Sequence, residues 1–298
     1  MINVSSNGIN VSVAELITLR QHAKYLSHDT KQAAKVLPGQ RLTEIRGRGI
    51  EFDSTREYQS GDDIRNMAWR VTARTLKPHV KVYQEDKERP VWMCLDLSPS
   101  LYFGTRMQFK SVLAIQMATL LGWAFRQAGE KVGSLIVDQD GFQIFKPQLS
   151  EASFLHVLNA FSLSSHKKLK ASAEPYLKSL LTKLSEVART GQPLYLFSDF
   201  HGWDTEIERQ ISLLAHRCQL HLKFIYDPFE EVAPPPHAYL LTDGKQKVLF
   251  DTQLKTVRRR YEDSFKQKKI AIENFAKQRQ IDLTFHSTNL EAVAKVSS

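Results

Sequence analysis

The sequence predicts an α/β fold with a doubly wound, mainly parallel sheet of the Rossmann type, preceded by an N-terminal segment that is helical or irregular and rich in arginine. Short uninterrupted apolar runs are typical of strands buried on both faces. Longer runs with helical periodicity alternate with them, which implies right-handed crossovers and helices on both faces of the sheet. The expected strands are residues 91–95, 132–137, 194–197, 220–226 and 281–285, and the expected helices are residues 106–128, 154–161, 176–187, 206–215 and 254–279.

Two hairpins are expected beside these elements. Residues 141–145 alternate between apolar and polar side chains, as a hairpin partner of the strand at residues 132–137 would. Residues 239–241 and 247–250 flank an Asp-Gly pair, which is typical of tight turns between antiparallel strands.

The chain before residue 90 has a different pattern. Ser12 and Glu15 have the spacing of a capping box, which predicts a helix over residues 13–26. Residues 35–51 lack a helical period and are expected to form a loop or a short strand. We therefore expect an N-terminal segment of residues 1–89 and a second domain of residues 90–298.

A second helix is expected inside this N-terminal segment. The Gly61-Asp62-Asp63 stretch supplies an N-cap, and the helix is predicted to continue through Arg74. Its inner face is expected to consist of Ile64, Met67, Ala68 and Val71.

Composition narrows the functional classes. The chain has 41 basic and 32 acidic side chains, a net charge of +9, which favours acidic partners without specifying them. Its two cysteines cannot form a disulfide framework, which favours a reducing compartment. No apolar run reaches the roughly 20 residues of a membrane helix, and residues 1–10 lack the pattern of a signal peptide, so we expect a cytoplasmic protein without membrane insertion.

Polar side chains follow two of the expected strands directly. Asp96, Ser98 and Ser100 follow the first strand, and Asp199 follows the strand at residues 194–197. Ligands of open parallel sheets bind at the carboxyl ends of strands, where these side chains would lie. Because only oxygen ligands are available, the pattern favours Mg²⁺, Mn²⁺ or Ca²⁺ over zinc. The alternative is that each residue caps the following helix.

The arrangement resembles the metal-ion-dependent adhesion site of von Willebrand factor A domains. In those domains a D-x-S-x-S loop, a threonine of a second loop and an aspartate of a third loop hold Mg²⁺. By this resemblance Asp96, Ser98 and Ser100 form the first loop and Asp199 belongs to the third. The second loop departs from the usual Gly-Gly-Thr turn, and Ser172 is the residue that would supply its hydroxyl.

The chain also resembles the domain of unknown function 58 family, over about residues 35–230. Members carry an ordered block of Gly, Glu, Phe, Arg, Tyr, Asp and Trp residues directly before such a domain. The matching residues are Gly49, Glu51, Phe52, Arg56, Tyr58, Gly61, Asp62, Asp63, Arg65, Trp69, Ala73, Arg74, Tyr83, Glu85 and Asp227-Pro228-Phe229-Glu230.

These resemblances imply a protein-interaction module that is not an enzyme. A partner's acidic side chain would replace a water on the divalent ion. Proteins resembling this family commonly act beside MoxR-type AAA+ ATPases in assembly or metal insertion, so such an ATPase, a client protein, or both are the implied partners. His201 is the only nearby candidate base for chemistry at this site.

Two other classes of function stay open. A nucleic-acid-binding protein would use the basic surface, and its affinity would fall steeply with salt. A metal-dependent phosphoesterase would use Asp96 and Asp199. The arginines of residues 46–74 fit either phosphate contacts or an internal ion-pair network with the interleaved acids, and we favour the network.

Overall fold

The computed structural model describes residues 7–23, 50–59, 61–85, 90–167, 175–242 and 247–289. The chain forms two compact units, of which the larger comprises Met1–Lys35 with Arg89–Ser298 and the smaller Val36–Glu88. This division differs from the expected one at its N-terminal end. The first helix belongs to the larger unit because Leu16 is buried in its core and the indole of Trp123 donates a hydrogen bond to the Leu16 carbonyl.

The larger unit is built on a six-stranded sheet, which confirms the predicted α/β class with a mainly parallel sheet. The strand order is β10-β7-β6-β3-β4-β5, and the pairing is parallel except between β4 and β5. The architecture is compatible with a Rossmann-like fold. The strands are β3 (Val91–Asp96), β4 (Val132–Asp138), β5 (Gly141–Gln148), β6 (Pro193–Ser198), β7 (Gln219–Tyr226) and β10 (Asp282–Ser287).

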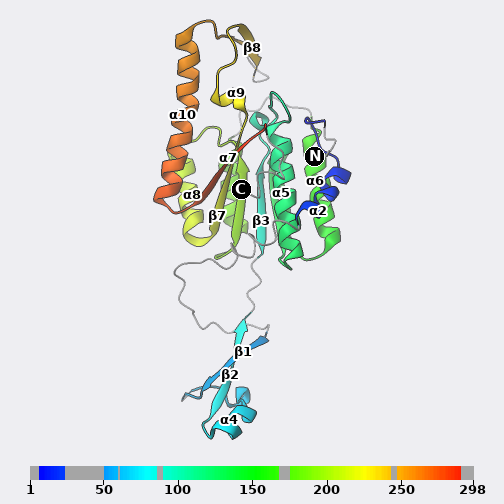
Figure 1. The fold of residues 1–298 in the computed structure, drawn as a ribbon, viewed down its shortest axis with the longest axis vertical. Helices are drawn as coiled ribbons and strands as arrows, with labels where there is room; N and C mark the ends of the chain where they lie inside the picture. The colour runs from blue at the N-terminus through cyan, green and yellow to red at the C-terminus, as the bar shows by residue number, and fades with distance from the viewer. Residues whose placement is uncertain are drawn as a thin grey trace. The chain divides into compact units, whose positions relative to one another are not determined.

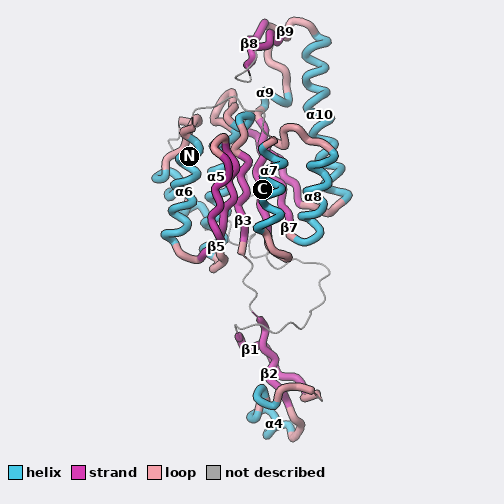
Figure 2. Tube along the Cα trace, turned by 180° about the vertical axis from the view of Figure 1, so that it is seen from behind, coloured by secondary structure: helices cyan, strands magenta, loops and turns pink. Residues whose placement is uncertain are grey.

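Helices cover both faces of this sheet (Figures 1 and 2). Every residue of β3 is buried, and its side chains alternate between two cores: Met93 and Leu95 contribute to one, Trp92 and Cys94 to the other. The first core is closed by α1 (Val13–Thr18), α2 (Arg20–Ala23), α5 (Lys110–Gln127) and α6 (Glu151–Ser165), and the second by α7 (Tyr176–Val187), α8 (Thr205–Arg217) and α10 (Lys255–Gln278).

The expected first helix is shorter and broken. Ser12 forms the predicted capping box with Glu15, but the helix is interrupted at Leu19 between α1 and α2. Residues 24–26 of the prediction lie outside the described residues.

Beyond β7 the chain forms the short helix α9 (Pro228–Glu231) and then an antiparallel hairpin of β8 (Ala238–Thr242) and β9 (Lys247–Asp251), as predicted. The hairpin contacts α10 through the rings of Phe250 and Tyr261, whose centroids are 5.0 Å apart. None of the helices that the structure describes is long and apolar enough to cross a membrane.

The smaller unit contains an antiparallel pair of strands, β1 (Ile50–Glu57) and β2 (His79–Glu85). The single helix expected up to Arg74 is instead two pieces, the 3₁₀ turn η1 (Ile64–Asn66) and α4 (Trp69–Thr75). The helix is interrupted because Met67 leaves the helical conformation and forms a bridge with Val80. The expected inner position of Ile64 is therefore wrong, and its side chain is 65% exposed.

Candidate functional site

Two neighbouring parallel strands end at the candidate site. β3 ends at Asp96, and β6 ends at Ser198, one residue before Asp199. The strands pair in parallel register with Leu95 opposite Phe197, so their carboxyl ends lie at the same edge of the sheet. Backbone geometry thus brings the two loops together.

The Asp96 carboxylate is buried, and each of its oxygens accepts one hydrogen bond. One oxygen accepts the backbone N–H of Ser98 at 3.1 Å, and the other accepts the hydroxyl of Ser198 at 2.7 Å. Burial and the nearby charge of Asp199 raise the pKa of Asp96 to about 6. The charged form of this carboxylate is therefore poorly compensated by its surroundings.

The two hydroxyls of the first loop are adjacent. The oxygens of Ser98 and Ser100 are 3.1 Å apart, and the Ser100 hydroxyl is close enough to Asp199 to help lower the pKa of its carboxyl group. The structure thus brings together Asp96, Ser98, Ser100 and Asp199. Ser172, the expected fifth member, lies outside the described residues.

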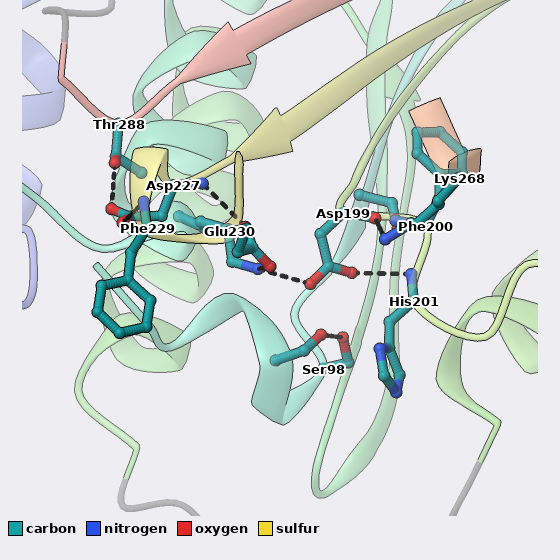
Figure 3. A network of polar contacts seen from close by, with 12 residues as sticks. Ser98, Asp199, Phe200, His201, Asp227, Phe229, Glu230, Lys268 and Thr288 are labelled. Carbon is teal, nitrogen blue, oxygen red and sulfur yellow. Dashed lines mark hydrogen bonds and ion pairs between the residues drawn. The ribbon is translucent and has the colours of Figure 1, made fainter. Parts of the chain in front are cut away.

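A buried lysine neutralises Asp199. The ammonium group of Lys110 donates to Asp199 Oδ2 and to Glu230 Oε1, each at 2.8 Å, and its side chain is only 1% exposed. Figure 3 shows Asp199 and Glu230 near Ser98. Burial alone would raise the pKa of Asp199, but Lys110 and Lys268 outweigh it and keep the pKa well below its ordinary value. Asp199 is therefore ionised while Asp96 is poised to take up a proton.

The long C-terminal helix also reaches the site. Lys268 of α10 donates to the backbone carbonyl of Asp199 at 2.6 Å, and its ammonium group lies 5.2 Å from the ring centroid of Phe224. Phe200, which follows Asp199 in the chain, has a left-handed backbone with φ of 51° and is buried. Its N–H bonds to Ser198 Oγ, which fixes this turn.

Asp227 anchors the turn that carries Glu230 (Figure 3). It caps α9, accepts the N–H and hydroxyl of Thr105, and accepts the hydroxyl of Thr288. Glu230 completes the capping box by accepting the Asp227 N–H at 2.9 Å. Because the other oxygen of Glu230 binds Lys110, this capped turn positions the lysine.

Sequence reasoning missed Lys110 and assigned Lys268 no role at the site. The available signal for Lys110 was a lone lysine at the start of a helix whose other residues are almost all apolar. Glu230 appeared only as part of the family resemblance. No pattern in the sequence connects Glu230 with Asp199, because the two carboxylates are linked by Lys110 of α5.

The site offers carboxylate and hydroxyl oxygens as possible metal ligands. Among the residues described, no group of three or more His, Cys, Asp or Glu side chains could hold a metal ion. Asp96 with the two serine hydroxyls offers hard oxygen donors, which suit Mg²⁺ better than zinc. His201 contacts Asp199 through its backbone N–H at 3.0 Å, so its imidazole is not the contacting group.

The fold and this site define an α/β protein with a polar strand-end site on a Rossmann-like sheet. The chain belongs to the family described as protein of unknown function DUF58, which it matches over residues 54–271. Uncharacterized proteins of Mycobacterium bovis and Mycobacterium tuberculosis are 42% identical to it over 103 residues. The match covers 35% of this chain and 32% of each relative, so it spans about a third of the relatives' length.

Proposed function

We propose that this protein is a non-catalytic interaction module of the von Willebrand factor A type, which binds a partner protein through a divalent ion at the strand-end site. The observation that carries the proposal is the convergence of four oxygen-bearing side chains, Asp96, Ser98, Ser100 and Asp199, from two loops. The class of ion is Mg²⁺, with Mn²⁺ or Ca²⁺ as alternatives.

The donor spacing supports a metal. For metal–oxygen bonds of about 2.0–2.1 Å, neighbouring ligands of an octahedral ion lie about 3 Å apart. The oxygens of Ser98 and Ser100 are 3.1 Å apart. Asp96, Ser98 and Ser100 would hold the ion, and the ion would offer an open position to a carboxylate of the partner.

The charges around the site also favour a bound divalent ion. The ammonium groups of Lys110 and Lys268 face the carboxylates of Asp96, Asp199 and Glu230, so one negative charge is left uncompensated. A divalent ion converts that deficit into one positive charge, which a single partner carboxylate then neutralises. Asp199 needs no direct metal bond in this arrangement, because Lys110 already pairs with it.

The partner proposed is a MoxR-type AAA+ ATPase, a client protein, or both, presenting an Asp or Glu side chain during assembly or metal insertion. This choice rests on the family resemblance. Interaction is favoured over phosphoester hydrolysis because hydrolysis needs a positioned base, and the contact of His201 with Asp199 is made by its backbone.

Calorimetric titration of the full chain with Mn²⁺ tests the metal site. We expect one ion per chain and at least tenfold weaker binding in Asp96→Asn and Ser98→Ala. Asp140→Asn removes a carboxylate from the β4–β5 turn and serves as the control, with unchanged binding. Equal binding by Asp96→Asn and the unaltered chain would refute the site.

Capture of a purified MoxR-type ATPase by the immobilised chain tests the partner. Capture should require Mg²⁺ and disappear with EDTA or with Asp96→Asn. Equal capture with and without EDTA would exclude the adhesion mechanism.

A further inference from the structure

The smaller unit carries a surface that the strand-end site does not use. In it, α4 packs against β2 through one side only: the Ala68 N–H donates to the His79 carbonyl at 2.8 Å, and the His79 N–H donates to Thr72 Oγ1 at 3.0 Å. Figure 2 shows α4 beside this strand pair. The opposite side of α4 is exposed.

Large exposed apolar side chains occur along this segment, in the helix and directly before and after it in the chain. Trp69 is 65% exposed, Ile64 in the preceding turn is 65% exposed, and Leu76 directly after the helix is 89% exposed. Single exposed apolar residues are ordinary, but here three large ones lie within thirteen consecutive residues. Trp69 is the most exposed of the four tryptophans, because Trp92 and Trp123 are buried and Trp203 is half-buried.

Three arginines accompany these side chains. Arg65, Arg70 and Arg74 are exposed, and none of them forms an ion pair with another residue in the described part of the chain. Arg56 shows the contrast, since it binds both oxygens of Asp62 at 2.9 and 2.7 Å. The predicted internal network therefore includes Arg56 but leaves three guanidinium groups available.

Few apolar side chains are buried in the described part of the smaller unit. Within residues 55–59 and 61–81, the buried apolar side chains are Ala68 and Val80. A two-stranded sheet with a short helix is marginally stable alone, so covering the exposed apolar side chains would add apolar burial to these elements.

We propose that this surface docks an acidic segment of a partner protein that carries an apolar side chain beside its carboxylates. We call the surface the Trp69 patch, which consists of Ile64, Arg65, Trp69, Arg70, Arg74 and Leu76. The three arginines, which have no ion pair within the described residues, favour an anionic partner, and guanidinium forks match carboxylates in two-point contacts.

The composition of the patch favours a protein over nucleic acid. Tryptophan and arginine dominate the energetics of protein interfaces, usually where an apolar side chain fills the centre. Single-stranded nucleic acid is bound by several aromatic platforms along a basic groove, whereas this patch has one aromatic side chain flanked by two aliphatic ones.

Anisotropy titrations of the full chain test the docking. The probes are a labelled helical peptide with repeated Glu and Leu, the same peptide with Gln for each Glu, and a labelled 20-nucleotide poly-dT. All titrations contain EDTA, so that a metal at the strand-end site contributes nothing and the two proposals fail separately.

We expect the Glu peptide to bind at least tenfold more tightly than the Gln peptide and poly-dT. Trp69→Ala and the double variant Arg70→Ser/Arg74→Ser should each weaken that binding about tenfold or more. The charge-matched control is Arg258→Ser/Arg260→Ser on α10, which should change binding less than twofold. Circular dichroism checks that the variants remain folded.

Quenching of tryptophan fluorescence tests whether the patch is open in the free chain. Iodide should quench the unaltered chain more strongly than Trp69→Phe, because Trp69 is exposed beside three cations. Equal quenching would mean that the chain itself covers Trp69, and this overturns the proposal. Equal binding of the two peptides, tighter binding of poly-dT, or an equal loss in the α10 control would also overturn it.

Discussion

Lys110 shows how one side chain determines the charge state of the site. Its ammonium group lies between Asp199 and Glu230, and burial, which would lower its pKa, is outweighed by these two carboxylates, so the pKa is raised. Removing one member of such a buried pair leaves the other charge without a counter-ion.

Lys110→Met should therefore be strongly destabilising. We expect a loss of about 3–5 kcal/mol in the free energy of unfolding, measured by urea denaturation at pH 7. Lys110→Met/Asp199→Asn should recover part of the loss, because the orphaned charge is gone. Lys183→Met, which removes the exposed pair with Glu186, is the control and should cost no more than about 1 kcal/mol. Equal losses in the two single variants would contradict a buried charge pair.

Asp96 should make stability depend on pH in the opposite sense to a paired carboxylate. Its pKa is raised from 3.8 to about 6, so the folded chain binds a proton more tightly than the unfolded chain does. Stability should fall as pH rises from about 4 to 6, by about 1.4 kcal/mol for each unit of pKa difference. Asp199 and Lys268 are the charged groups that act on it.

Urea denaturation of the unaltered chain and Asp96→Asn over this pH range measures the effect. The free energy of unfolding of Asp96→Asn, relative to that of the unaltered chain, should increase from pH 4 to 6 and then level off. Mg²⁺ should reduce that difference above pH 6, since it stabilises the ionised carboxylate. A difference that does not vary with pH would contradict the raised pKa.

Among the elements, α5 and α6 pack very closely against each other. Gly122 lies inside α5, and a Cβ at this position would be 2.5 Å from the tip of the Phe154 ring of α6. Phe154 is buried and packs edge-on against Trp123, so it has little room to move.

Gly122→Ala should therefore destabilise the chain by about 1–3 kcal/mol, despite the better helix propensity of alanine. In a Phe154→Leu background the same change should be neutral or stabilising, because the clash is absent. Thermal unfolding of the unaltered chain, the two single variants and the double variant measures this double-mutant cycle. A stabilising Gly122→Ala in the unaltered background would contradict the close packing.

The elements that sequence predicted best are those with uninterrupted or strongly periodic apolar patterns. The run at residues 91–95 is typical of a buried strand, and β3 spans Val91–Asp96. The interruption at Met67 was not predictable, because it depends on a long-range bridge to Val80. Local capping signals at Asp63 were correct, but they start a 3₁₀ turn and not a continuous helix.

At the scale of the whole molecule, the strand-end site was partly predictable for a topological reason. Asp96 and Asp199 each follow a strand of one parallel sheet, so their convergence follows from strand order once β3 and β6 are neighbours. Lys110 and Glu230 could not be placed in the same way, since their contact depends on how α5 and α9 meet across the fold.

The two units divide the proposed tasks. The larger unit holds the oxygen-rich site, and the smaller unit holds the Trp69 patch. One proposal needs a divalent ion and the other needs only complementary charge and apolar contact. A partner that engages both would combine their affinities, because the second contact is made within one complex.

Anomalous diffraction from crystals grown with Mn²⁺ tests the central claim most directly. We predict one strong anomalous peak in direct contact with Asp96, Ser98 and Ser100, with the Lys110–Asp199 pair intact and an open position for a partner's carboxylate. Crystals in which this site gives no peak at saturating Mn²⁺, with Asp96 bonded only to Ser98 and Ser198, would contradict it.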